Sequence, residues 1–201
     1  MFDGPNGKQS LVDLFGGKSQ LIVYHFMLGP DWKEGCPSCS LLADHFDGMV
    51  VHLAQRDVAF VVASRAPLQL IEKFKRRLGW NFKWVSSFGN DFNFDYQVSA
   101  TTGREGDRRH DLQLCRDTIP QRRAPGASVF FKNSAGEVLH TYSSYGRGLD
   151  ILIGAYNFLD IAPKGRDEDG LKYGMAWVRH HDKYEGAIVD PKAAYQEPRS
   201  S

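Results

Sequence analysis

Residues 20–39 of the sequence, QLIVYHFMLGPDWKEGCPSC, decide the fold. The first part, Gln20 to Leu28, is a continuous apolar run rich in β-branched and aromatic residues, which predicts a strand buried on both faces of a sheet. The segment GPDWKEG that follows has the glycine, proline and aspartate content of a loop. The final GCPSC therefore places two cysteines at the point where the next helix should begin.

Apolar periodicity on both sides of this stretch predicts alternating helices and strands. Before it, SLVDLF at residues 10–15 is interpreted as a short strand or turn. After it we predict, in order, a helix from Ser38 to about Ala54, a strand from Asp57 to Ala63, a helix that Pro67 begins and Gly79 ends, a strand from Lys83 to Phe88, a hairpin over residues 127–142 and a well-packed helix from Gly148 to Leu159. Strand–helix–strand units favour a parallel core, to which the hairpin adds antiparallel strands. The prediction is an α/β protein with a mixed central sheet and helices on both faces.

The length of 201 residues is that of one domain with additions. We predict a domain over residues 1–189, with a charged, aliphatic-poor insertion at 101–124 before the hairpin and a C-terminal extension at 160–189. Residues 190–201 lack apolar periodicity and are expected to form a disordered tail.

Composition excludes several classes of protein. Hydrophobic residues make up 42% and charged residues 24% of the chain, which excludes a wholly disordered or fibrous protein. The 25 basic and 24 acidic residues leave a net charge of +1, which favours neither a nucleic acid nor a membrane as partner. No apolar run is long enough to span a bilayer, and the start does not resemble a secretory signal, so we expect a cytoplasmic protein.

The two cysteines of GCPSC have the spacing of a redox pair. Cys36 falls at the predicted N-cap and Pro37 at the first helical position, where proline is favoured. Unpaired backbone N–H groups there stabilise a thiolate, the nucleophilic form of cysteine. Cys39 lies one turn further along and can attack a mixed disulfide formed at Cys36. The spacing predicts a thiol–disulfide oxidoreductase in which Cys36 attacks and Cys39 resolves, with no bound cofactor.

Three alternatives stay open for this pair. Half a zinc site would need further ligands, for which Cys115, His180 and His181 are the candidates. The two cysteines could instead be ordinary buried core residues. A non-enzymatic redox-sensing or ligand-binding module is the third alternative.

The chain resembles the domain-of-unknown-function family numbered 899, a thioredoxin-like group. The matching segments span nearly the whole chain: QLIVYHFMLGPDW, GCPSCS, FDGMVVHL, SRAPL, GWNFKWVSSFGNDFNFDY, SVFF, HTYSSYGRGLD, YNFLDIAPKGRDE and WVRHHDKY. The resemblance implies a thioredoxin-like three-layer fold and a thiol-based role. It also implies a substrate that is a disulfide-containing protein or a small-molecule thiol or peroxide.

A thiol peroxidase of the peroxiredoxin type is the alternative that this resemblance raises. Peroxiredoxins carry a proline seven residues and a threonine three residues before the peroxidatic cysteine. In this sequence Pro30 is six residues before Cys36, and Lys33 occupies the threonine position. The hydroxyl that would orient a peroxide is missing from that position, which makes the oxidoreductase the favoured prediction.

Other residues are candidates for supporting roles. Trp32 could shape a substrate groove, although packing over the loop is the favoured interpretation. Pro125 is the candidate for the cis-proline of thioredoxins, although an ordinary trans turn proline is an equal alternative. Lys33 and Glu34 are interpreted as solvated charges that could assist the thiols. His25 is predicted to be a hydrogen-bonded core histidine.

Residues distant in sequence are weaker candidates. His180, His181 and Asp182 could cover the site or transfer protons, although a structural role is favoured. Arg122 and Arg123 are favoured as loop charges, and Cys115 as a bystander thiol.

Overall fold

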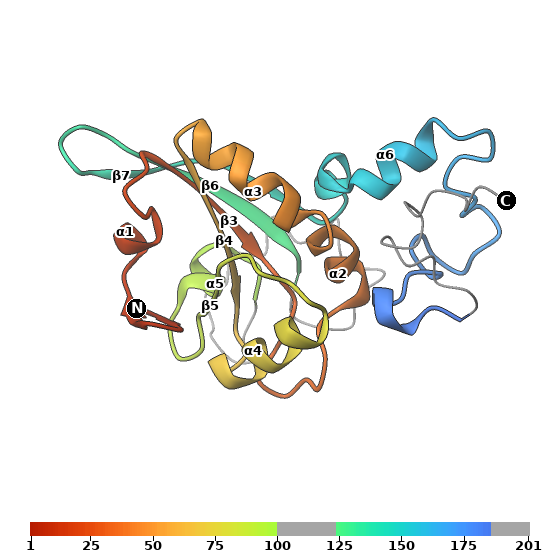
Figure 1. The fold of residues 1–201 in the computed structure, drawn as a ribbon, viewed down its shortest axis with the longest axis horizontal. Coiled ribbons are helices and arrows are strands. Elements are labelled where there is room, and N and C mark those ends of the chain that lie inside the picture. Colours follow the sequence, from red (N-terminus) through yellow and green to blue (C-terminus); the bar gives the residue numbers. More distant parts are fainter. Residues whose placement is uncertain (100–123, 186–201) are drawn as a thin grey trace, which may run out of the picture.

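A mixed seven-stranded sheet forms the centre of the protein (Figure 1). The computed structural model describes residues 1–99 and 124–185. In the order across the sheet, the strands are β2 (Gly7–Gln9), β1 (Phe2–Gly4), β5 (Trp84–Ser86), β4 (Val58–Ser64), β3 (Gln20–His25), β6 (Gly126–Lys132) and β7 (Val138–Tyr145). β3 pairs in parallel with β4 and antiparallel with β6, and β4 pairs in parallel with β5. The predicted parallel core with an added antiparallel hairpin is confirmed.

Six α-helices and two 3-10 segments accompany the sheet in the described part of the chain. The helices are α1 (Leu11–Leu14), α2 (Pro37–Ala43), α3 (Phe46–Gln55), α4 (Leu68–Arg77), α5 (Phe92–Asp95) and α6 (Gly154–Asp160), and the 3-10 segments are Gly146–Leu152 and His181–Lys183. Among these residues, no helix combines the length and apolar character that crossing a membrane requires.

Alternation along β3 divides the core between the two faces of the sheet. Tyr24 contributes to a cluster with apolar side chains of α2, α3, α4 and α6. Leu21 and Val23 point to the opposite face, where a smaller cluster includes side chains of α1 and α5. Helices therefore cover both faces, as predicted. The topology and layering are those of a thioredoxin-like α/β fold, as the resemblance implied.

The first helix was not predicted. Residues 11–14 form α1, whereas the sequence was interpreted as a short strand or turn there. The reason is a capping box: the Asp13 backbone N–H donates to Ser10 Oγ at 3.2 Å, and the Asp13 carboxylate accepts from the Ser10 backbone N–H at 2.7 Å. These bonds satisfy donors at the helix start and stabilise a single turn.

The long helix predicted from Ser38 to about Ala54 is wrong, because it is divided into α2 and α3 at Asp44 and His45. Contacts with distant parts of the chain hold both residues. Asp44 accepts a hydrogen bond from Trp80 Nε1 at 2.8 Å, and His45 Nε2 accepts one from the backbone N–H of Ala155 at 3.1 Å. The apolar stripe continues through the break, so periodicity alone could not show it.

The helix predicted from Gly148 to Leu159 is also divided, into the 3-10 segment and α6. The expectation that this segment is packed on most sides is wrong. Tyr156 is fully buried, but Ile151 and Phe158 are 76% and 74% exposed. Only one side of the segment contacts the core, because the chain leaves the sheet at this point (Figure 1).

The limits of the predicted additions stay predictions. Ala124 is the one residue of the 101–124 insertion within the described ranges, and the 190–201 tail lies wholly outside them. In the described part of the predicted extension, Asp160 is the last residue of α6, and residues 161–185 are irregular, with turns, bends and one 3-10 segment, His181–Lys183.

Candidate functional site

Cys36 lies at the end of the loop that follows β3, where α2 begins. It is the N-cap of α2, with extended backbone angles (φ −60°, ψ 130°), and Pro37 occupies the first turn of the helix. This is the placement that the sequence predicts. The Cys36 backbone N–H donates to the Met27 carbonyl oxygen at 3.0 Å, which ties the loop to the residues following β3.

The residue before Cys36 must be a glycine for reasons of space. A Cβ added to Gly35 would lie 2.5 Å from a ring carbon of Phe26 and 2.7 Å from one of Phe74. Both rings belong to the core cluster, so neither can move without disturbing it. The backbone of the cysteine loop therefore lies directly against the core.

The two thiols differ in exposure. Cys36 is half-buried, whereas Cys39 is buried at 2% exposure, and neither forms a disulfide. Beneath them lies Tyr24, which is fully enclosed and forms a side-chain hydrogen bond with Cys39. An incoming molecule therefore meets Cys36 before Cys39.

The pKa values of the thiols move in opposite directions. A hydrogen bond from the Cys39 thiol and backbone N–H groups of Cys39 and Ser38 lower the pKa of Cys36 to about 6, although burial opposes this. Burial raises the pKa of Cys39 well above its usual value, and the nearby negative charge of Cys36 adds to this. Near neutral pH, Cys36 is thus the thiolate and Cys39 the thiol, the arrangement that a nucleophile and a resolving cysteine require.

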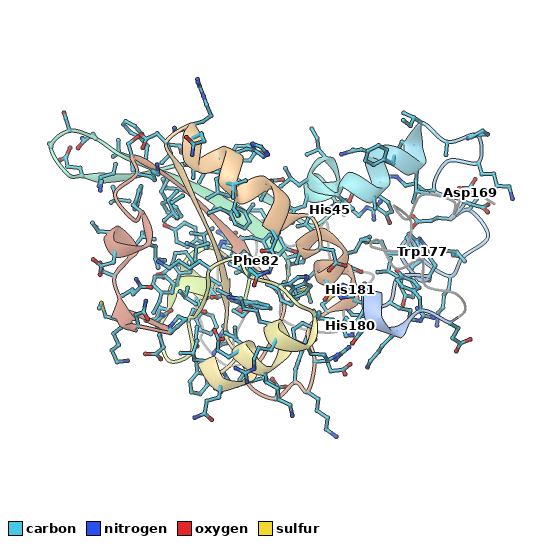
Figure 2. The ribbon with its side chains drawn as sticks, in the orientation of Figure 1. His45, Phe82, Asp169, Trp177, His180 and His181 are labelled. Atoms are coloured by element: carbon cyan, nitrogen blue, oxygen red, sulfur yellow. The ribbon has the colours of Figure 1, made fainter. Side chains whose placement is uncertain are left out.

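The C-terminal segment completes the site from far along the chain. His180 directly precedes the last 3-10 segment and His181 is its first residue, and this end of the segment lies beside α2 (Figure 2). His180 is buried, and its Nε2 lies 2.8 Å from the Gly35 carbonyl oxygen, while its Nδ1 lies 3.1 Å from an Arg77 guanidinium nitrogen. His181 Nδ1 lies 2.7 Å from Asp44 Oδ1 instead.

An ion network surrounds the His180 contact. Arg77 donates to both carboxylate oxygens of Asp182, at 2.7 and 2.9 Å, and to Glu34 at 2.7 Å. Lys183 Nζ lies 2.8 Å from each Glu34 oxygen. Hydrogen bonding to Lys183 lowers the pKa of Glu34, which stays ionised. Glu34 thus forms an ion pair with the C-terminal segment, whereas the sequence predicts a solvated charge.

The remaining candidate residues have varied surroundings. Trp32 is half-buried and packs against the core cluster, as does Cys36. The described residues include no cis peptide bond, so Pro125 is the trans turn proline of the two alternatives. It directly precedes β6, whose Gly126 pairs with His25 near the cysteine loop. Lys33 is exposed.

His25 is a buried core histidine with a hydrogen bond, as predicted. Its Nε2 lies 2.9 Å from Ser128 Oγ, and its ring stacks against Phe92 and Tyr96 on the face opposite the thiols. Cys115, Arg122 and Arg123 lie outside the described residues.

The two histidines considered as zinc ligands are engaged with Gly35 and Asp44. Within residues 1–99 and 124–185, no three His, Cys, Asp or Glu side chains gather in a manner that could hold a metal ion.

Sequence reasoning missed Tyr24 and Arg77. Strand alternation places Tyr24 on the same face as Phe26 and could have identified it as a residue beneath the helix that carries the thiols. Arg77 is one of three consecutive basic residues at the end of α4, and no local pattern distinguishes it from Lys75 and Arg76.

A family model described as "Bacterial protein of unknown function (DUF899)" matches residues 1–184. The chain belongs to the DUF899 family. No curated protein is similar enough to this DUF899 chain to match it.

Several solved structures that resemble this DUF899 protein are peroxiredoxins. The bacterioferritin comigratory protein of Xanthomonas campestris, a structure described for alkyl peroxide reduction, has 11% identity and a TM-score of 0.49 over 75% of this chain and 86% of its own. Peroxidoxin BcpB of Mycobacterium tuberculosis has 13% identity and a TM-score of 0.49 over 76% of this chain and 87% of its own. The mitochondrial 2-Cys peroxiredoxin of Plasmodium falciparum has 13% identity and a TM-score of 0.48 over 85% of this chain and 91% of its own. Identities this low say nothing about activity, which must be argued from the site itself.

Proposed function

We propose that this DUF899 protein is a thiol–disulfide oxidoreductase. The observation that carries the proposal is the contrast within one helical turn, where a half-buried Cys36 with a pKa of about 6 precedes a buried Cys39 whose pKa is raised. A pair of ordinary core cysteines gives no reason for such a division between a thiolate and a thiol.

The first step is attack on a disulfide. The Cys36 thiolate attacks one sulfur of a substrate disulfide, forms a mixed disulfide with it and releases the other substrate sulfur as a thiolate. Near neutral pH no proton needs to be removed from Cys36, since its pKa of about 6 leaves it mostly ionised.

The second step uses Cys39. Cys39 loses its proton and attacks the Cys36 sulfur, which forms the Cys36–Cys39 disulfide and releases the second substrate thiolate. The dithiol has then passed two electrons to the substrate. Part of the rise in the Cys39 pKa comes from the charge and hydrogen bonding of Cys36. The mixed disulfide removes that charge, so Cys39 becomes easier to ionise when it is needed. A thiol reductant such as dithiothreitol then restores the pair.

The test is reduction of insulin disulfides with dithiothreitol as the electron source. We expect Cys36→Ser to remove all catalysis above the uncatalysed rate. Cys39→Ser should accumulate a mixed disulfide that mass spectrometry detects. Cys115→Ser is the matched control, because it removes a thiol outside the pair, and it should retain full activity.

Retention of activity by Cys36→Ser would contradict the proposal. Stopped-flow oxidation with hydrogen peroxide distinguishes the peroxidase alternative. If peroxide oxidises Cys36 far faster than it oxidises a free thiolate while insulin is not reduced, the protein is a peroxidase and the present proposal is wrong.

A further inference from the structure

We propose that His180 is a positioning residue for Cys36, which acts by holding the Gly35–Cys36 peptide in place. The inference deepens the proposed oxidoreductase function and rests on it. It makes the C-terminal segment, which begins far from the cysteines in sequence, a working part of the thiol site.

The first step of the argument is that both polar groups of this one peptide are held. Its carbonyl, from Gly35, accepts from His180 Nε2 at 2.8 Å, and its N–H, from Cys36, donates to the Met27 carbonyl at 3.0 Å. Met27 belongs to the segment directly after β3, and the core rings against Gly35 restrict the peptide further. Peptide orientation sets the direction in which the Cys36 side chain leaves the backbone.

That direction determines the chemistry of the sulfur. The Cys36 thiolate is stabilised by donors at Ser38 and Cys39, and such hydrogen bonds weaken steeply when the angle or distance changes. A peptide freed at its carbonyl can rotate and move the sulfur away from these donors. His180 therefore acts on the thiolate without touching it.

The second step is that His180 is itself fixed with the required proton. Arg77 donates to Nδ1 at 3.1 Å, so Nδ1 accepts and Nε2 carries the hydrogen that the Gly35 carbonyl receives. Arg77 is itself held in place, because it donates two hydrogen bonds to Asp182 and one to Glu34. The ring also lies edge-on to Phe74, with centroids 5.3 Å apart. These contacts hold the ring in one orientation, with Nε2–H directed at the Gly35 carbonyl.

The adjacent histidine offers a matched control. His181 is on the same segment, but its side chain is 43% exposed and contacts Asp44 rather than the cysteine loop. A merely structural attachment of the segment would involve both histidines. The positioning role belongs to His180 alone.

The experiment measures the rate at which iodoacetamide alkylates Cys36 as pH is varied, with the Cys36 peptide quantified by mass spectrometry. His180→Phe keeps a ring beside Phe74 but cannot donate, and His180→Gln keeps an amide donor. We expect His180→Phe to raise the midpoint of the pH profile by about one unit, which is roughly a tenfold loss of thiolate below the wild-type midpoint. His180→Gln should recover at least half of that shift, and His181→Gln should leave the midpoint unchanged.

Circular dichroism first establishes that each variant is folded. If His180→Phe does not fold, His180→Asn replaces it, since its shorter amide cannot reach the Gly35 carbonyl. An unchanged midpoint in the folded variant, or an equal shift in His181→Gln, would overturn the inference. A wild-type midpoint at the ordinary cysteine value would instead contradict the proposed function, so the two failures are distinguishable.

Discussion

The two faces of the sheet each bury a histidine, and they use it in opposite ways. On the thiol face, both ring nitrogens of His180 have partners, and those partners belong to the cysteine loop and to α4. On the other face, His25 Nε2 contacts Ser128, while Nδ1 is buried without a hydrogen-bond partner. Burial therefore decides little about a histidine's role until its partners are known. His180 is tied to a reactive loop, whereas His25 is tied to strands.

The largest expected effect concerns His25. Burial lowers the pKa of His25 to about 3, so the folded protein keeps it neutral while the unfolded chain takes up a proton below about 6.5. Folding stability should therefore fall as pH drops from 6.5 toward 3, by about 3 kcal/mol between pH 7 and pH 4. His25→Gln removes this contribution and should flatten the acid side of the stability profile measured by urea unfolding.

The control for that measurement is His140→Gln. His140 contacts Ser143 Oγ, and Ser143 in turn contacts Ser128, the partner of His25. The His140 side chain, however, is exposed. Its variant should keep the wild-type slope with pH. If His25→Gln also keeps that slope, the protonation of His25 does not govern acid stability and the contrast between the two faces fails.

A second effect, smaller than the first, tests the close packing of the thiol face. Gly35→Ala would place a methyl group against Phe26 and Phe74, so we expect a loss of about 1–3 kcal/mol in the free energy of unfolding. Gly48→Ala is the matched control, because Gly48 lies within α3 with no atoms near the added Cβ. That variant should be unchanged or more stable by about 0.5–1 kcal/mol, since alanine favours the helix. Equal behaviour of the two variants would show that the cysteine loop does not depend on contact with the core.

The smallest expected effect concerns the other face. Ser10→Ala removes the side-chain cap of α1 and should cost about 1 kcal/mol in urea unfolding. Cys36 alkylation should not change, because α1 packs against the cluster on the face away from the thiols. Ser10→Thr, which keeps a capping hydroxyl, should restore most of the stability. A change in the alkylation profile of Ser10→Ala would show that the two faces are coupled.

Much of the fold was predictable because its signals are local. The β-branched runs around Val23 and Val61 specify buried strands, and Pro37 directly after Cys36 specifies the start of a helix. The break at Asp44 was not predictable, since Trp80 and His181 hold that carboxylate from elsewhere in the chain. The α1 cap is a different case, because its Ser10–Asp13 spacing was present in the sequence and could have been recognised.

By itself, the sequence determined the alternation of strands and helices and the position of two cysteines at a helix start. Those features follow from periodicity and from the backbone preferences of neighbouring residues, which act within a few positions of the chain. Only the tertiary structure decided which cysteine is buried and which residues surround the pair. His180 meets Gly35 across 145 positions, and Lys183 meets Glu34 across 149. Such contacts depend on where the folded sheet delivers its loops and on the path of the C-terminal segment, and no local pattern encodes either.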